Sequence, residues 1–282
     1  MKLCRYGEVG KEKPGLIDNN GNIRDLSFLM GDIDHQTLDR KCLDAIRQLD
    51  PENLELIDKS VRIGAPIATP SKFIAIGLNY RDHAQEAGMP IPQEPVVFFK
   101  SPGSICGPHD DIFIPPHSSQ LDWEAELGII IGKQAKFIPQ EQAFDYIAGY
   151  CVVNDISERT FQFQSSQWDK GKSFDTFGPL GPYLVTADEI TDPQNLRIWL
   201  EVNGQVRQDS HTRQMIFPVA EIVAYLSRYM TLNPGDIIAT GTPPGVAMGM
   251  KPAPVWLKEG DVLSTHIEGI GELKQRLVKY PG

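Results

Sequence analysis

Short apolar runs separated by turn residues fill most of the chain and constrain its fold more than any other feature. The runs cover Phe73–Ile76, Val96–Phe99, Leu127–Ile131, Tyr150–Val153, Tyr183–Val185, Ile198–Val202, Asp236–Ala239 and Val262–Ile267. Runs of this length between turn signals are typical of strands. The 282 residues include 25 glycines and 22 prolines, which is above ordinary usage and argues against a long helical bundle. We expect a mostly β (α+β) domain with antiparallel or mixed sheets over residues 71–282, with one helix at 217–229.

The first 70 residues differ from the rest in their pattern of apolar residues, and we expect them to form a small N-terminal α+β domain (residues 1–70). An Asn20-Gly21 pair between apolar stretches indicates a β-hairpin. The spacing of apolar residues over 38–49 predicts a helix that ends before Pro51. Residues 65–70 then read as an extended linker, because a residue that precedes proline is disfavoured in the helical region.

Composition excludes several classes of function. The formal net charge is −10 and the pI is near 5.1, so phosphate backbones are repelled and nucleic acid is not an expected partner. No apolar run approaches the roughly 20 residues of a membrane helix, so no membrane partner is expected. No secretory signal is visible at the N-terminus. The four cysteines are widely spaced without a CxxC pair, which fits reduced thiols in a cytoplasmic protein.

Three carboxylates lie where buried strands are expected. Glu124 and Glu126 are two residues apart, so in a strand they point to the same face. Two carboxylates buried on one face persist as ions only if a cation lies between them. Oxygen ligands suit Mg²⁺, Mn²⁺ or Ca²⁺, and Asp155, at the end of another apolar run, would complete a three-carboxylate metal site. The alternatives are a solvated edge strand and an ordinary Asn-Asp turn.

A histidine and a glutamate form a candidate pair for proton transfer. His83 and Glu86 lie three residues apart in a short helical stretch after the run at 73–76, so they are neighbours on one helix face. A carboxylate beside an imidazole fixes its tautomer and raises its basicity, which suits a general base that acts on water. A surface pair without a function is the alternative.

Two loops contain groups that could stabilise an anion. Lys170 and Lys172 lie in a loop rich in glycine, serine and aromatic residues, and composition does not distinguish them. Either lysine could stabilise an enolate or neutralise a substrate carboxylate. The Gly/Pro turn at 239–246 has backbone amides and threonine hydroxyls that could bind a carboxylate, although it is not a Walker loop. A solvated lysine and a plain hairpin are the alternatives.

Together these segments resemble the fumarylacetoacetate hydrolase family. The matching pieces, in the family's order, are GLNYRDHAQE (77–86), DWEAELGIIIG (122–132), VVNDISERTFQ (152–162), KGKSFDTFGPLGP (170–182), LEVNGQVRQ (200–208) and PGDIIATGTPPGV (234–246). The opening of the chain is similar to a bacterial branch with a short N-terminal domain. Its members carry names such as ureidoglycolate lyase, 2-hydroxyhepta-2,4-dienedioate isomerase and 2,4-diketo-3-deoxy sugar-acid hydrolase. The resemblance implies a mixed β-sandwich roll, usually a homodimer, with a divalent metal.

The resemblance also implies roles for individual residues. It makes Glu124, Glu126 and Asp155 the metal ligands, and His83 with Glu86 the pair that activates water. It selects Lys172, rather than Lys170, as the lysine that supports the oxyanion or enolate. The remaining matches are Gln162 and Thr242 near the substrate, Thr176 in the second shell of the metal, and Arg81 for a substrate carboxylate.

The implied reaction is hydrolytic cleavage of a C–C bond in a 2,4-dioxo acid, with Mg²⁺ (or Mn²⁺, or Ca²⁺) as Lewis acid. The small-molecule substrate is an acylpyruvate or a diketo-deoxy sugar acid, and the products are pyruvate and a carboxylic acid. Decarboxylation of oxaloacetate-like acids and isomerisation of 2-hydroxy-diene-dioates are alternatives that use the same chemistry. A β-rich binding module with a structural cation is the non-enzymatic alternative, and a closed coordination shell would favour it.

Overall fold

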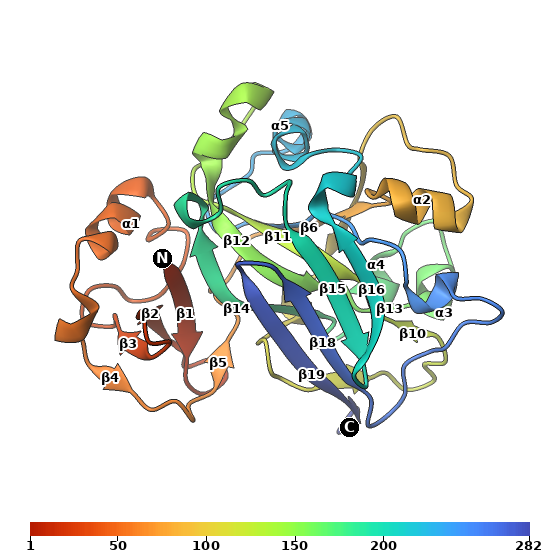
Figure 1. Cartoon of the computed structure of the whole chain (residues 1–282), viewed down its shortest axis with the longest axis horizontal. Helices are drawn as coiled ribbons and strands as arrows, with labels where there is room; N and C mark the ends of the chain where they lie inside the picture. The colour runs from red at the N-terminus through yellow and green to blue at the C-terminus, as the bar shows by residue number, and fades with distance from the viewer.

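The computed structural model describes all 282 residues of the chain. Figure 1 shows a small N-terminal part, coloured red to orange, beside a larger β-rich part. None of the helices combines the length and the apolar character needed to cross a membrane.

The largest sheet has twelve strands and runs through both parts. Its order is β4-β3-β2-β1-β14-β12-β11-β17-β6-β7, with β5 beside β1 and β8 beside β14. The antiparallel pairing of β1 with β14 joins the two parts, and the boundary near residue 70 stays a prediction. The strands are β1 (Lys2–Tyr6), β2 (Lys13–Ile17), β3 (Ile23–Asp25), β4 (Leu56–Ile57), β5 (Ile63–Gly64), β6 (Phe73–Gly77), β7 (Val96–Lys100), β8 (Ile105–Cys106), β11 (Ala125–Ile131), β12 (Ile147–Asn154), β14 (Gly178–Thr186) and β17 (Ile237–Ala239).

A second sheet of five strands and a two-stranded ribbon complete the β structure. The five-stranded sheet has the order β16 (Gln205–His211), β15 (Arg197–Val202), β18 (Val262–Ile267), β19 (Gly271–Lys279) and β9 (Ile112–Ile114), and the ribbon pairs β10 (Leu121–Asp122) with β13 (Ser157–Glu158). The α-helices are α1 (Arg40–Arg47), α2 (Arg81–Ala87), α3 (Arg159–Gln162), α4 (Asp169–Lys172) and α5 (Val219–Tyr229). Six 3₁₀ turns are η1 (Pro51–Asn53), η2 (Pro102–Ser104), η3 (Gln140–Tyr146), η4 (Ala187–Glu189), η5 (Thr212–Gln214) and η6 (Ala247–Gly249).

The mostly β prediction is confirmed. Each of the eight predicted runs coincides with one strand of the structure, and only Asp236, which directly precedes β17, lies outside its strand. The helix predicted at 217–229 is α5, and the one predicted at 38–49 is the shorter α1. The helix α1 begins after Asp39, whose side chain accepts the N–H of Cys42. The hairpin also forms, because Ile17 pairs with Ile23 across the Asn-Gly turn.

The segment 121–131 differs from the single strand that the sequence indicates. The strand β10 ends at Asp122 and β11 begins at Ala125, so Glu124 lies in a break between them. At this break the N–H of Glu124 donates to the side chain of Asn154 at 2.9 Å, in place of a backbone partner. The apolar runs also missed β1, β16 and β19, in which charged and polar residues interrupt the apolar ones, and β9, which has only three residues.

The two central strands β11 and β12 position the chemistry of the molecule. Every residue of both strands is buried, and they pair antiparallel with Glu126 opposite Val153. One carboxylate therefore sits inside a fully buried strand, and Asp155 follows directly where β12 ends. Side chains placed at these points need partners that replace water.

Candidate metal and catalytic site

Glu124, Glu126 and Asp155 come together at one end of the central strands. One carboxylate oxygen from each residue lies within 4.8 Å of the other two, and all three side chains are buried. The N–H of Asp155 donates to the carbonyl of Glu124 at 2.8 Å, which ties the end of β12 to the break before β11. The three carboxylates predicted as metal ligands thus converge, with spacing that one ion could bridge.

Lys172, the last residue of α4, lies directly on this carboxylate group. Its Nζ atom is 2.6 Å from Oε2 of Glu124 and 2.8 Å from Oδ2 of Asp155, and the side chain is buried. Lys170, two residues earlier, is exposed. The structure therefore separates the two lysines that composition left equivalent.

Two buried cations at the site were missed by the sequence analysis. Lys100, at the end of β7, places Nζ 2.6 Å from Oδ1 of Asp155. Arg159, at the start of α3, places Nη2 2.6 Å from Oε1 of Glu124 and Nε 2.9 Å from Oδ2 of Asp122. Lys100 directly follows the apolar run at 96–99. Its place at the end of a strand that is expected to be buried was the only feature of the sequence that could have indicated a buried lysine.

The charge of the buried group leaves one carboxylate without a cation. The group contains four buried carboxylates, Asp122, Glu124, Glu126 and Asp155. It contains three buried cations, Lys100, Arg159 and Lys172.

Glu126 is the carboxylate without an ion pair, and its hydrogen bond comes from the N–H of Gly241 at 2.8 Å. Burial, together with the charges of Asp155 and Glu124, raises the pKa of Glu126 well above its usual range. Burial also raises the pKa of Glu124, but Lys172 and Arg159 outweigh it and hold that pKa at about 2. An oxygen-only donor set with one uncompensated carboxylate fits a hard divalent cation.

His83 and Glu86 form the predicted pair on α2. Nδ1 of His83 is 3.2 Å from Oε2 of Glu86, and the two side chains are 13% and 28% exposed. The N–H of Gly245 donates to both oxygens of Glu86, at 3.1 and 3.2 Å. The amides of the Gly/Pro turn do bind carboxylates, as its composition suggested, but here the carboxylates belong to the protein itself.

The other predicted site residues have protein partners in the structure. The amide oxygen of Gln162 accepts from Arg159 at 2.9 Å, which places Gln162 beside the cation that holds Glu124. The hydroxyl of Thr242 donates to the carbonyl of Ala125 at 3.0 Å, so it lies against the start of β11. Their substrate roles stay predictions.

Arg81 and Thr176 are directed toward backbone groups outside the carboxylate group. The guanidinium of Arg81 donates to the carbonyl of Met215, and its side chain is exposed. The hydroxyl of Thr176 accepts from the N–H of Phe113 at 2.8 Å. These hydrogen bonds go to backbone atoms and not to Glu124, Glu126 or Asp155, and the roles expected of Arg81 and Thr176 stay predictions.

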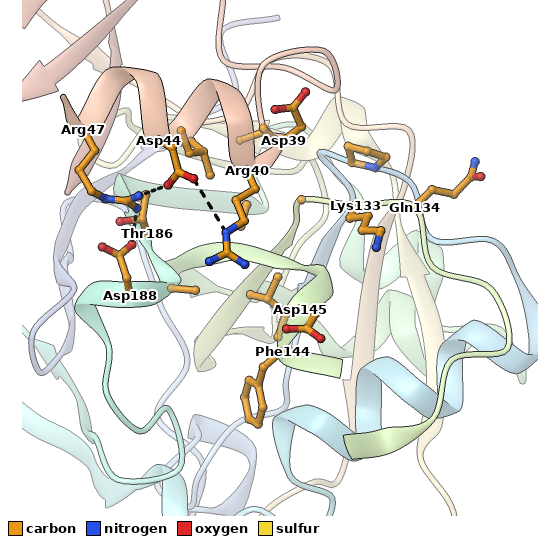
Figure 2. A pocket seen from close by; sticks show the side chains of 17 residues that line it. Asp39, Arg40, Asp44, Arg47, Lys133, Gln134, Phe144, Asp145, Thr186 and Asp188 are labelled. Atoms are coloured by element: carbon orange, nitrogen blue, oxygen red, sulfur yellow. Dashed lines mark hydrogen bonds and ion pairs between the residues drawn. The ribbon is translucent and has the colours of Figure 1, made fainter. Parts of the chain in front are cut away.

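A separate cavity of about 700 Å³ lies between α1, the residues 132–134 that follow β11, the junction of η3 with β12 and the junction of β14 with η4. Figure 2 shows charged side chains around it, with Arg47 directed at Asp44 and Asp188. None of the predicted site residues lines this cavity. Arg40 and Arg47 pair with Asp44 and Asp188, so these charges are already compensated within the protein. We therefore place the chemistry at the carboxylate group and not here.

Comparisons with known proteins identify relatives that span most of this chain. The family described as fumarylacetoacetate (FAA) hydrolase, C-terminal, matches residues 72–278. A protein of Burkholderia multivorans, provisionally named as a hydrolase, is 57% identical over 98% of both chains. Among solved structures, fumarylacetoacetate hydrolase from Exiguobacterium antarcticum has a TM-score of 0.86 and 37% identity, and covers 99% of this chain and 100% of its own.

Two further solved structures carry more specific names. The 2-hydroxyhepta-2,4-diene-1,7-dioate isomerase of Mycobacterium marinum has a TM-score of 0.75 and 33% identity, with full coverage of both chains (100%). Maleylpyruvate hydrolase from Sphingobium sp. SYK-6, solved with manganese(II) and pyruvate, has a TM-score of 0.83 and 30% identity over 99% of both chains. With a family match over most of its length and these relatives, the chain belongs to the fumarylacetoacetate hydrolase family.

Proposed function

We propose that this chain is a divalent-metal-dependent hydrolase that cleaves the C3–C4 bond of 2,4-dioxo acids, giving pyruvate and a carboxylic acid. The observation that carries the proposal is the combination of a buried three-carboxylate group with a hydrogen-bonded His83–Glu86 pair. The two are joined through the turn that contains Gly241 and Gly245. A site with a cation position and a separate base is what metal-assisted hydrolysis needs.

The residues that would hold the metal are Glu124, Glu126 and Asp155. A bound dication would supply Lewis-acid polarisation of the carboxylate and 2-oxo oxygens of the substrate. Among Mg²⁺, Mn²⁺ and Ca²⁺, the Mn²⁺ held by the maleylpyruvate hydrolase supports Mn²⁺ as a usable ion, and Mg²⁺ shares its preference for oxygen.

His83 would act as the general base. It takes a proton from the water whose oxygen bonds to C4, and Glu86 stabilises the imidazolium that forms. The C3–C4 bond then breaks, its electron pair goes to C3 as the enolate of pyruvate, and C4 leaves as the carboxylic acid. A proton returned to C3 completes the addition of one water molecule across the bond.

Lys172 would stabilise the enolate oxygen. An ammonium group has three N–H donors, and Glu124 and Asp155 engage two of them. The third donor is therefore available to a substrate oxygen next to the carboxylate group. Donors fixed in a buried site stabilise developing negative charge more strongly than water does.

Isomerisation or decarboxylation through the same enolate is the second candidate. It is favoured by the similarity to the 2-hydroxyhepta-2,4-diene-1,7-dioate isomerase. These reactions could use the metal ligands and Lys172 in the same way, but they add no water across the C3–C4 bond. The products therefore separate them from hydrolysis.

The test is a screen of metal-stripped protein reloaded with Mg²⁺ or Mn²⁺. A panel of 2,4-dioxo acids that begins with acetylpyruvate is assayed for pyruvate by coupled reduction, and for the second acid by chromatography. We expect equal amounts of the two acids. Release of CO₂ from oxaloacetate alone, or absorbance changes of a hydroxy-diene-dioate without cleavage, would instead assign the alternatives. No pyruvate from any panel member with metal bound would refute the hydrolase.

Two further expectations concern the oligomeric state of the protein and its location in the cell. We expect a homodimer, which light scattering coupled to gel filtration measures directly. We also expect the protein in the cytoplasm, which fractionation of the source cells tests.

A further inference from the structure

The turn segment 241–248 contacts both functional groups of the site through its backbone. The N–H of Gly241 donates to Oε2 of Glu126 at 2.8 Å. The N–H of Gly245 donates to Glu86 at 3.1 and 3.2 Å, and Glu86 in turn contacts His83. The position of this segment therefore sets a metal ligand and the base pair at the same time.

One buried carboxylate holds the far end of this segment. Oδ1 of Asp122 accepts the N–H of Ala247 at 2.7 Å, and Oδ2 accepts the N–H of Met248 at 3.1 Å. The side chain of Asp122 is fully buried. Hydrogen bonds from backbone N–H groups to an ionised carboxylate are among the stronger ones in proteins. No role in the proposed reaction accounts for this residue.

The same carboxylate is linked to a metal ligand. Oδ2 of Asp122 lies 2.9 Å from Nε of Arg159, and Nη2 of Arg159 lies 2.6 Å from Oε1 of Glu124. Arg159 therefore spans two carboxylates with fixed guanidinium geometry. A shift of Asp122 changes how Arg159 holds Glu124.

The backbone of segment 241–248 has little freedom to adjust if Asp122 moves. Gly245 has a φ of +100°, and a Cβ at this position would lie 1.9 Å from the carbonyl oxygen of Arg207. The indole N–H of Trp123 donates to the carbonyl of Gly245 at 3.1 Å. The segment is thus packed as a rigid link between Asp122 and Glu86.

We propose that Asp122 is a positioning residue with two routes to the site. It fixes segment 241–248, which holds Glu126 and the His83–Glu86 pair, and it orients Glu124 through Arg159. The inference rests on the proposed function for the roles of those residues. Its test relies on metal affinity and amide exchange, which do not require a known substrate.

The test compares Asp122→Asn with a matched control, Asp18→Asn. Asp18 is also buried, and it accepts two backbone N–H groups, from Asn20 and Asn22, and Nε of Arg24 at 2.9 Å. In either variant one acceptor oxygen becomes an NH₂ donor that faces other donors. The two changes match chemically, but only Asp122 is connected to the site.

We expect the calorimetric Mn²⁺ affinity of folded, metal-stripped Asp122→Asn to fall about 10- to 100-fold, the usual effect of losing a residue that orients a ligand. We expect Asp18→Asn to keep the wild-type affinity. The ring ¹⁵N signals of His83, assigned with His83→Ala, should shift in Asp122→Asn only. Wild-type Mn²⁺ affinity together with unshifted His83 signals in Asp122→Asn would overturn the proposal, even if its melting temperature falls.

An experiment on the unaltered chain covers the case in which Asp122→Asn does not fold. Coupling between two sites is reciprocal, so an ion at the carboxylates must also stabilise the segment. Hydrogen exchange of peptides from 240–250 should slow when Mn²⁺ is added, and peptides around Asp18 should not change. Unchanged exchange at 240–250 with Mn²⁺ bound would overturn the proposal. If Mn²⁺ slows exchange at 240–250 but no panel member releases pyruvate, the proposed hydrolase reaction is refuted and the positioning role of Asp122 is not.

Discussion

Replacement of Lys172 by methionine tests the charge balance of the site most directly. The Nζ atom is buried between Glu124 and Asp155, at 2.6 and 2.8 Å, and the three side chains are 2%, 10% and 0% exposed. Methionine has a similar length and keeps the packing, but it leaves those carboxylates with one cation fewer. Removal of one partner from a buried ion pair costs about 3–5 kcal/mol.

This free energy converts into a measurable melting temperature. A chain of 282 residues has an unfolding entropy of about 0.6 kcal/mol/K, so the loss corresponds to roughly 5–8 °C. A dication at the same carboxylates replaces the missing charge. Saturation with Mn²⁺ at about 100 times its Kd adds about 2.7 kcal/mol. We therefore expect a low melting temperature in chelator and a rise on adding Mn²⁺ that exceeds the wild-type rise.

Scanning calorimetry of metal-stripped protein, with and without Mn²⁺, measures both values. Lys170→Met is the matched control, since Lys170 lies on the same short helix but is exposed. An exposed substitution of this kind is usually within about 0.5 kcal/mol of neutral. If Lys172→Met melts within about 1 °C of the wild type in chelator, the ion pairs carry no net free energy and the reasoning is refuted.

Three other outcomes follow from the same geometry. His83→Ala should lower kcat about 10²–10⁴-fold, the usual contribution of a general base, with unchanged Mn²⁺ affinity by calorimetry; unchanged turnover would remove His83 from the mechanism. Glu126→Gln should lose bound metal, measured as metal content after desalting, and retention of one equivalent would refute the ligand assignment. The raised pKa of Glu126 favours its protonated form in the metal-free fold relative to the unfolded chain, so the stability of the metal-free protein falls as pH rises toward and through that pKa. The metal must displace this proton, so Mn²⁺ affinity should rise with pH, and a flat profile would contradict the assignment.

The eight strands that coincide with apolar runs could be predicted because each run between turn residues has the length and composition of a buried strand. The i,i+3 spacing of His83 and Glu86 likewise needs only a helical turn. The pairing of β11 with β12, which brings Glu126 and Asp155 to the same end, is not a local pattern, and the three carboxylates could be assigned to one site in advance only by the family resemblance.

The buried cations could not be predicted in the same way. Lys100 reaches Asp155 across 55 positions, so its role depends on the order of strands and not on any local pattern. Arg159 is close to Asp155 in sequence, but its partner Asp122 is 37 positions away. The break at Glu124 has the same origin, because its N–H is taken by the side chain of Asn154 on the neighbouring strand. Tertiary partners decide all three cases.

The oxygen atoms of Glu124 and Asp155 place Lys172 in competition with a bound dication. Both oxygens of each carboxylate already accept from a buried cation, and Lys172 takes one oxygen of each. Each oxygen has two acceptor positions, so the ligands remain usable, but a dication and the ammonium oppose each other across them. Lys172→Met should therefore bind Mn²⁺ more tightly than the wild type while it loses turnover. That combination would support the proposed role of Lys172, in which the third N–H donor of its ammonium group acts on the substrate.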